Sequence, residues 1–195
     1  MRIFVLAARA AYNYYDFDVE RLEEYGRFDI IVQSLIQAVC VSREYRKDVI
    51  FYAILSRPNR PISLEIVSEK IKGILPNEKQ FAEKIKENLE KYYKKRDLDA
   101  GFNFYEMDLI PLLRFIKQKY NPNFFVLHEK GENLEKDYLS ENNCFILGDH
   151  IGLPKKVEDF IIREFNAKKI SLGSVSYLTS TSIAIINFLL DKFIL

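Results

Sequence analysis

The sequence predicts an α/β domain with a mostly parallel β-sheet flanked by helices. Short apolar segments alternate along the chain with longer segments whose apolar residues recur at helical spacing. Residues 48–55 form a continuous apolar run rich in β-branched and aromatic residues, which is typical of a strand buried on both faces of a parallel sheet. The chain has 195 residues, of which 48% are hydrophobic. That length and apolar content suit one domain, which we expect to span residues 1–195.

In the first third of the chain we expect a strand at residues 1–8, then a loop with turns, and a helix that begins near Asp29. The apolar positions of that helix are Ile30, Ile31, Leu35, Ile36 and Val39. The strand at 48–55 is followed by SRPNRP, a turn with two prolines, and by a short strand at 62–67.

The middle of the chain is rich in lysine and glutamate. Residues 76–97 predict an amphipathic helix whose apolar stripe is Phe81, Ile85 and Leu89. Residues 98–108 are expected to form a loop, and a second helix is expected after Pro111.

The last third returns to short strands, NFFVLHEKGEN, CFILGDHIG and KKISLG. Between the second and third strands a helix is predicted at 153–165, with Pro154 near its first position, where proline is favoured. The final helix, within residues 176–195, is apolar on most of its surface. Such a helix is usually buried, often against a partner subunit.

Composition excludes several classes of protein. The net charge of +1 argues against a strongly basic nucleic-acid coat protein. No run of 18 apolar residues occurs and the start of the chain does not have the pattern of a secretory signal, so we expect a cytoplasmic protein without a membrane span. Cys40 and Cys144 lie in apolar runs and are predicted to be buried thiols, and no spacing typical of a metal site is present. The chain also lacks a P-loop and a GxSxG motif.

Three loops are candidates for a binding site, because ligands of parallel sheets bind at the carboxyl ends of the strands. They are HEKGEN, GDHIG and LGSVSYLTSTS. In the second loop, Gly148 and Gly152 allow close approach of a ligand to the backbone, while Asp149 and His150 add polar groups. The alternative is an ordinary turn in which Asp149 binds backbone N–H groups, and residues 180–182 are equally suited to capping the last helix.

A fourth candidate is a set of charged residues beside predicted buried elements. Arg27 and Asp29 lie at the start of one helix, and Arg46 and Asp48 lie just before a strand. An arginine can hold a phosphate or a flipped base, although charges at such positions are often caps and solvated ends. Further cations that we consider for RNA binding are Arg43, Lys47, Arg57, Arg60, Lys91, Lys94, Lys95 and Arg96, the last four on a helix face that is equally consistent with solvent.

Taken together, four segments resemble the archaeal tRNA pseudouridine-54 N1-methyltransferase family of the SPOUT superfamily. They are residues 26–55, FVLHEKGEN, CFILGDHIGLP and residues 168–192. The resemblance covers most of the chain and is loose only in the middle, so we expect a variable helical insert at about 77–120.

The resemblance implies a fold and a cofactor. Residues of about 123–195 would be tied in a trefoil knot that binds S-adenosylmethionine (SAM) and mediates formation of a homodimer, and no metal would be needed. The substrate would be tRNA that contains pseudouridine. The residues expected around the cofactor are Leu127, Gly148, Asp149, Gly152, Ser171, Leu172, Leu178 and Ser182.

The chemistry that the resemblance implies requires loss or strong polarisation of the N1 proton of pseudouridine, and in-line placement of N1 for methyl transfer. Asp29 is our first candidate for the catalytic base and Asp48 the second. Arg27 and Arg46 would bind the substrate.

Five positions depart from the family pattern. The family has Asn-His-Cys where this chain has residues 180–182, and a histidine where it has Asn187. Gly173 stands where a serine is expected. Two other functions therefore stay open beside the tRNA enzyme. They are a related methyltransferase that acts on pseudouridine in ribosomal RNA, and a knotted RNA-binding protein that has lost SAM.

Overall fold

The computed structural model describes residues 1–42 and 44–194, and a seven-stranded sheet runs through its centre. The strand order is β6-β5-β4-β1-β8-β7-β9. The strands are β1 (Arg2–Ala7), β4 (Val49–Leu55), β5 (Ile62–Val67), β6 (Phe102–Tyr105), β7 (Asn123–Asn133), β8 (Asn143–Gly148) and β9 (Lys168–Ser171). Neighbouring strands from β4 to β9 are parallel, whereas β5 and β6 are antiparallel additions at one edge. The predicted α/β class with a mostly parallel sheet is confirmed.

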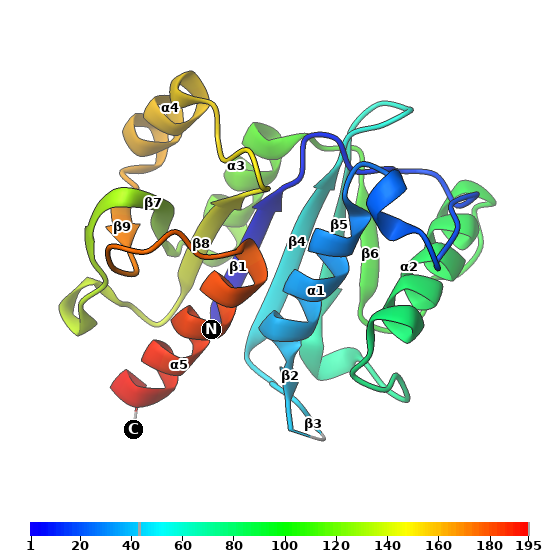
Figure 1. Cartoon of the computed structure of the whole chain (residues 1–195), viewed down its shortest axis with the longest axis horizontal. Coiled ribbons are helices and arrows are strands. Elements are labelled where there is room, and N and C mark those ends of the chain that lie inside the picture. Colours follow the sequence, from blue (N-terminus) through cyan, green and yellow to red (C-terminus); the bar gives the residue numbers. More distant parts are fainter. Residues whose placement is uncertain (43, 195) are drawn as a thin grey trace.

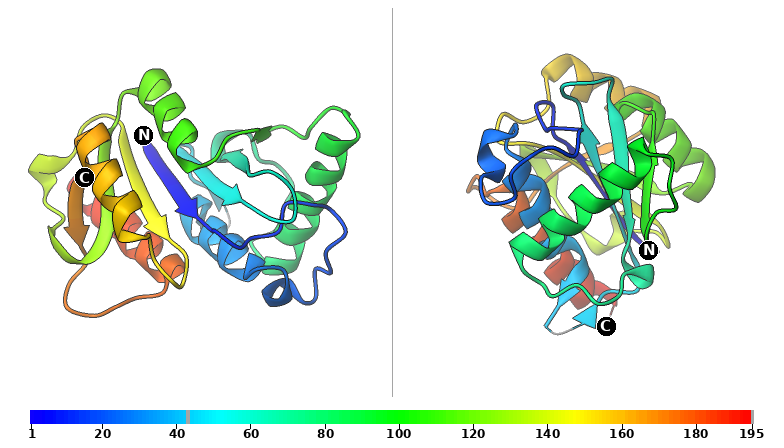
Figure 2. Two further views of the ribbon diagram at one scale, coloured as in Figure 1. Left: turned by 90° about the horizontal axis from the view of Figure 1, so that it is seen from above. Right: turned by 90° about the vertical axis from the view of Figure 1, so that its right-hand side faces the viewer.

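Helices cover both faces of the sheet (Figure 1, Figure 2). One face carries α1 (Phe28–Val39), α2 (Glu78–Tyr93) and α5 (Thr179–Ile194). The other carries α3 (Leu109–Tyr120) and α4 (Lys155–Phe165). Because side chains alternate along a strand, β1 sends Phe4 and Leu6 into the first core and Ile3 and Val5 into the second.

Short elements complete the chain. Three 3-10 helices lie at η1 (Leu22–Glu24), η2 (Ser68–Lys70) and η3 (Lys136–Tyr138), and a small hairpin pairs β2 (Cys40–Val41) with β3 (Glu44–Tyr45). Among the described residues, no helix is long and apolar enough to cross a membrane.

The structure corrects the sequence prediction in the middle of the chain. The predicted loop at 98–108 contains β6, whose Phe102 and Phe104 are buried while the alternate side chains are half-buried. Helix α3 begins at Leu109 rather than after Pro111, because the Asp108 carboxylate accepts a hydrogen bond from the Leu109 N–H (2.7 Å) and proline is tolerated in a first turn.

The two cysteines differ in burial. Cys144 is buried in β8 as predicted, whereas Cys40 is only half-buried because it ends α1 at the small hairpin. Burial raises the pKa of both thiols, that of Cys40 to about 11. Both are therefore protonated at neutral pH and poor nucleophiles.

Candidate active site

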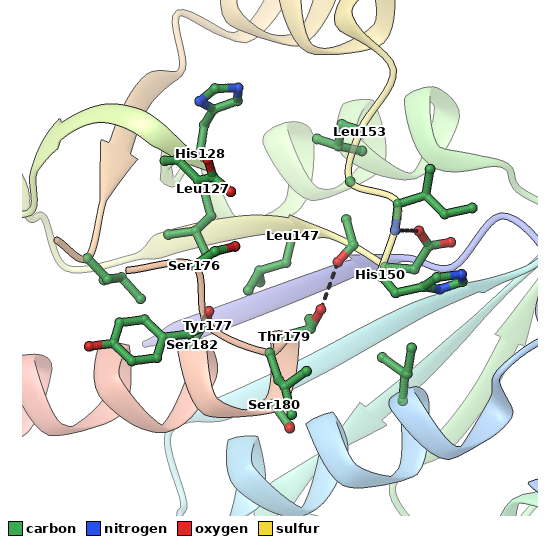
Figure 3. Close-up of a pocket in the computed structure, with 18 of the residues that line it drawn as sticks. Leu127, His128, Leu147, His150, Leu153, Ser176, Tyr177, Thr179, Ser180 and Ser182 are labelled. Atoms are coloured by element: carbon green, nitrogen blue, oxygen red, sulfur yellow. Dashed lines mark hydrogen bonds between the residues drawn. The ribbon is translucent and has the colours of Figure 1, made fainter. Parts of the chain in front are cut away.

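A cavity of about 620 Å³ opens where the parallel strands β7, β8 and β9 reach their carboxyl ends (Figure 3). The loops after these strands and the first turns of α1 and α5 surround it. All eight residues predicted to bind the cofactor line this cavity, although they come from three separate segments of the chain: Leu127, Gly148, Asp149, Gly152, Ser171, Leu172, Leu178 and Ser182. The structure thus brings them together, and their role as ligands stays a prediction.

The loop after β8 is held by the Asp149 carboxylate. One oxygen accepts a hydrogen bond from the Ile151 N–H (2.9 Å). The other accepts one from the N–H of Arg9 (3.2 Å), a residue just after β1. The Arg9 guanidinium also donates to the Gly152 carbonyl (3.1 Å). Asp149 therefore orders the turn, as the structural alternative predicted, and the ordered turn forms one wall of the cavity. His150 is exposed at the tip of this loop.

Gly148 is the point of closest approach inside this loop. A Cβ at Gly148 would lie 2.6 Å from the Cα of Gly152 and 2.8 Å from the Leu153 nitrogen, so only glycine fits. The Gly148 carbonyl accepts a hydrogen bond from the Thr179 hydroxyl (3.1 Å) at the start of α5. Figure 3 shows this bond bridging the two loops. Thr179 was not singled out from the sequence, where it is one of several hydroxyl residues in a row.

Apolar and polar side chains share the rest of the lining. Leu127, Leu147 and Leu172 contribute side chains from three different strands or their ends, and Ser182 lies buried in the first turns of α5. The Ser171 hydroxyl donates to the Gly173 carbonyl (3.0 Å) and accepts from its N–H (3.2 Å), which shapes the loop after β9. Apolar walls with a few backbone and hydroxyl groups suit a flat heteroaromatic ring whose edge is read by hydrogen bonds.

Sequence reasoning missed a charged group made of two lining residues, Glu158 and His128, and the neighbouring Lys169. Glu158 of α4 is only 5% exposed and pairs with Lys169 of β9. The Nε2 of His128 lies 3.8 Å from the Glu158 carboxylate, and its Nδ1 accepts a hydrogen bond from the Lys130 N–H (3.0 Å). The three side chains come from three elements, so no local spacing reveals the group. Its one local signal is an acidic residue in the first turn of a helix.

Arg27 lies at the cavity rim and is hydrogen-bonded to Asp29, which is not itself part of the lining. Arg27 lines the cavity and donates through Nε (3.0 Å) and Nη2 (2.9 Å) to the Asp29 carboxylate. This hydrogen-bonded carboxylate raises the pKa of Arg27. Arg27 has a left-handed backbone (φ 61°), as does Gly26 (φ 68°), whose missing Cβ leaves room for the Ala10 carbonyl. The turn therefore fixes where the charged pair points.

Arg46 and Asp48, by contrast, lie just before the amino end of β4. The cavity lies at the other, carboxyl ends of the parallel strands. Arg46 makes two hydrogen bonds with Asp191 of α5 (2.7 and 2.8 Å), and Asp48 pairs with Arg2 (3.0 Å). The structure does not bring these residues together with Asp29. The same network holds the helix at Asn187, whose side chain accepts from Arg2 (3.0 Å) and donates to the Gln37 carbonyl (2.9 Å).

The other cations considered for RNA binding fall into two groups. Lys91 pairs with Asp99, Lys94 pairs with Glu90, and Lys84 joins Lys91 in holding the pKa of Asp99 at about 2. Within the described residues, the remaining cations form no ion pair: Lys47, Arg57, Arg60, Lys95 and Arg96. Arg43 lies outside the described residues. Over those same parts of the chain, no three metal-ligating side chains gather as a metal site would require.

Comparison with known proteins identifies the family. The model of the family described as "Putative SAM-dependent RNA methyltransferase" matches residues 1–194. A tRNA (pseudouridine(54)-N(1))-methyltransferase of Methanocaldococcus jannaschii is 30% identical over 98% of this chain and 97% of its own length. The enzyme of the same name from Thermococcus kodakarensis is 32% identical over 98% and 99% of the two chains.

A solved structure agrees with the fold. Nep1 of Archaeoglobus fulgidus, crystallised with S-adenosylhomocysteine, superimposes with a TM-score of 0.66 over 98% of this chain and 97% of that one, at 15% identity. With a family model that matches nearly every residue and relatives that align from end to end, this chain belongs to the family of SAM-dependent RNA methyltransferases that includes the archaeal tRNA (pseudouridine(54)-N(1))-methyltransferases.

Proposed function

We propose that this protein is a SAM-dependent tRNA methyltransferase that methylates N1 of pseudouridine 54. The observation that carries the proposal is the alignment over nearly full length, at about 30% identity, with archaeal proteins that bear this activity in their names. The cavity at the carboxyl ends of the parallel strands supports it, because that is where such sheets bind their ligands.

The cavity fits the cofactor in size and in chemistry. Its volume of about 620 Å³ is within the usual range for a site of this kind. Leu127, Leu147 and Leu172 would enclose the adenine ring, and backbone groups of the Gly148–Gly152 loop would read its edge. The missing side chain of Gly148 lets the backbone of Gly152 and Leu153 pack against it, which shapes this loop. When bound, SAM supplies a methyl group made electrophilic by the positively charged sulfur.

Two residues at the rim are proposed to act on the substrate. N1 of pseudouridine carries a proton, and it becomes a good nucleophile when a base accepts or polarises that proton. Asp29 is our candidate for this role because it is bound by Arg27, which lines the cavity, whereas Asp48 lies at the amino ends of the strands, away from the cavity. The remaining donors of Arg27 would hold the base or a phosphate.

We further propose a trefoil knot in residues of about 123–195. The path of the last segment supports it, since β9 lies at the sheet edge whereas α5 packs against α1 and contacts the loop after β8 through Thr179. A homodimer is proposed from the large apolar side chains left exposed near the cavity and on α5, which are Ile151, Val175, Tyr177, Leu178 and Phe188. A tRNA substrate places the reaction in the cytoplasm.

The first experiment is titration calorimetry with S-adenosylhomocysteine, followed by methylation of tRNA transcripts. One transcript carries pseudouridine at position 54, and its control carries uridine there. We expect micromolar binding of the ligand, and 1-methylpseudouridine detected by mass spectrometry in the first transcript alone.

The outcomes separate the three functions that the sequence left open. Methylation of a pseudouridine-containing ribosomal RNA fragment in preference to tRNA would replace the proposed substrate. RNA binding with no binding of S-adenosylhomocysteine would make the protein a binding module without catalysis, and would assign the loss to the altered residues 180–182.

A further inference from the structure

A cluster of tyrosines lies at the same end of the sheet as the cavity, where the parallel strands β1 and β4 reach their carboxyl ends. The segment that follows β1, the turn between β4 and β5, and the carboxyl end of α2 meet there (Figure 1, upper right). Tyr14 lies 4.4 Å from Tyr15 and 4.9 Å from Tyr93, measured between ring centroids. All three rings are half-buried and therefore keep part of their surface open to solvent.

Asn13 explains how three distant segments are fixed together. Its side chain is fully buried, donates to the Arg60 carbonyl (2.9 Å), and accepts from the Asn59 N–H (3.1 Å). Its own carbonyl accepts from the Tyr93 hydroxyl (2.8 Å). The cluster is thus rigid and is built before any ligand arrives, which reduces the entropy lost on binding.

The tyrosines are surrounded by cations that have no partner of their own. Within the described residues, Arg57, Arg60, Lys95 and Arg96 are exposed and form no ion pair. Lys94, which pairs with Glu90, also lies over the Tyr15 ring at 5.6 Å from its centroid. Residues 12–16, 56–60 and 90–97 hold six basic and three acidic residues, a net charge of +3 in a chain whose total is +1. The acidic ones are Asp16, Glu90 and Asp97.

This surface is continuous with the cavity rim. Gly26 packs against Ala10, and the next residue, Arg27, lines the cavity. Nearby, the rings of Tyr12 and Tyr25 are in contact, with centroids 5.3 Å apart. Two residues farther along the chain, Tyr14 begins the cluster. An RNA whose target base enters the cavity would therefore pass next over these tyrosines.

We propose that these residues form an RNA-binding platform, on which an unpaired nucleotide of the substrate stacks against Tyr14 while the arginines hold the neighbouring phosphates. The platform consists of Tyr14, Tyr15, Tyr93, Arg57, Arg60, Lys94, Lys95 and Arg96. Aromatic faces bind bases of any sequence, and cations bind the backbone, which is the pairing that single-stranded nucleic acid requires. The proposal rests on the proposed tRNA substrate for its ligand, yet it is tested separately.

The test measures the affinity of fluorescent tRNA for three variants between about 50 and about 200 mM salt. Arg57→Glu/Arg60→Glu should weaken binding about 10-fold or more and reduce the salt slope of log Kd by about 1.5, because two phosphate contacts are lost. Tyr14→Ala should weaken binding about 5- to 100-fold with little change in the salt slope. Tyr14→Phe, which keeps the ring, should bind like the wild type.

Lys70→Glu/Lys72→Glu is the matched control. Both lysines are exposed and follow the carboxyl end of β5, which is antiparallel to β4 and therefore ends on the side of the sheet away from the cavity. The same change of charge there should leave tRNA affinity within about twofold. All variants should bind S-adenosylhomocysteine normally, which verifies the fold and the cavity. At saturating tRNA, kcat of the platform variants should equal that of the wild type while KM rises.

Affinity within about twofold of wild type in both Arg57→Glu/Arg60→Glu and Tyr14→Ala would overturn the platform, as would equal weakening by the lysine control. Those results would leave the methylation reaction untouched. Conversely, a wild-type protein that binds tRNA through the platform but leaves pseudouridine unmethylated would refute the proposed function and retain the platform.

Discussion

At the scale of single residues, Gly148 carries the sharpest steric requirement of the cavity. The atoms that a Cβ would meet belong to the backbone of Gly152 and Leu153, which cannot rotate away as a flexible side chain does. The Asp149 carboxylate fixes this backbone from both sides through two N–H groups. Any side chain at Gly148 must therefore displace this loop, which lines the cavity.

We expect Gly148→Ala to weaken binding of S-adenosylhomocysteine at least about 10-fold, because the displaced loop narrows the proposed cofactor site. Titration calorimetry measures this directly. Gly73→Ala is the control for a loop glycine without steric contact, since Gly73 has open space around it and differs from Gly148 in its left-handed backbone (φ 72°). It should lose about 1 kcal/mol of stability and still bind normally. Undiminished binding to Gly148→Ala would locate the cofactor elsewhere.

Asp29→Asn tests the proposed base. An amide keeps the shape of the carboxylate but cannot accept the N1 proton, so kcat should fall about 100-fold or more. Affinity for S-adenosylhomocysteine should stay within about twofold. Asp48→Asn should instead lower thermal stability, because Asp48 pairs with the buried Arg2. If Asp48 were the base, Asp48→Asn would lower kcat and Asp29→Asn would leave kcat unchanged.

At the scale of elements, α5 is joined to the sheet by a network at its carboxyl half. Asp191 receives hydrogen bonds from Arg46 and Arg2, and these two cations hold the pKa of Asp191 below its usual value. Asn187 adds bonds to Arg2 and to the end of α1. Because α5 also supplies Thr179 and Ser182 to the cavity, the network positions the site from a distance.

Asp191→Asn should lower the free energy of unfolding by about 1–2 kcal/mol at pH 7, a modest value because the carboxylate is partly exposed. A lowered pKa means that the carboxylate stabilises the fold above its unfolded pKa of about 3.9 and loses this effect as the pH falls through the folded pKa. Urea unfolding at pH 7 and about pH 3 should therefore show the difference between wild type and variant shrink in acid. A difference that stays constant would contradict the ion-pair explanation.

At the scale of the whole molecule, large apolar side chains are exposed on α5 and at the mouth of the cavity. Phe188 on α5 is 65% exposed, and Leu178 and Ile151 at the mouth of the cavity are 73% and 69% exposed. Side chains of this size are rarely left in water together unless a partner covers them. A second copy of the chain at this surface would also close the cavity mouth.

We expect the wild type to sediment as a dimer and Phe188→Glu as a monomer, because a carboxylate buried at an apolar interface is strongly unfavourable. Leu75→Glu is the control, since Leu75 is also exposed (61%) but lies in the loop before α2. It should leave the dimer intact. A wild type that is monomeric at micromolar concentration would contradict the proposed assembly.

The features that could be predicted from the sequence are those set by interactions between residues close together along the chain. Periodicity located most strands and helices, because burial of one face imposes a local repeat. It missed β6, a short edge strand whose pairing with β5 is set across the sheet rather than within the segment. The sequence also kept Asp48 as the second candidate for the base and Arg46 as a substrate-binding residue, because both, like Arg27 and Asp29, are charged residues at predicted element ends.

By itself, the sequence determined the α/β class, the loops at the carboxyl ends of the strands, and the family, because glycine spacing, apolar runs and motif order are properties of neighbouring residues. Only the tertiary structure decided which charged pairs face the cavity. It placed Arg27, with Asp29 bound to it, at the cavity, and it joined Arg46 and Asp48 to the network that holds α5. It also assembled Glu158, His128 and Lys169, and gathered the tyrosines beside Arg57 and Arg60. The reason is physical: these contacts join segments that are distant in sequence and become neighbours only when the sheet forms.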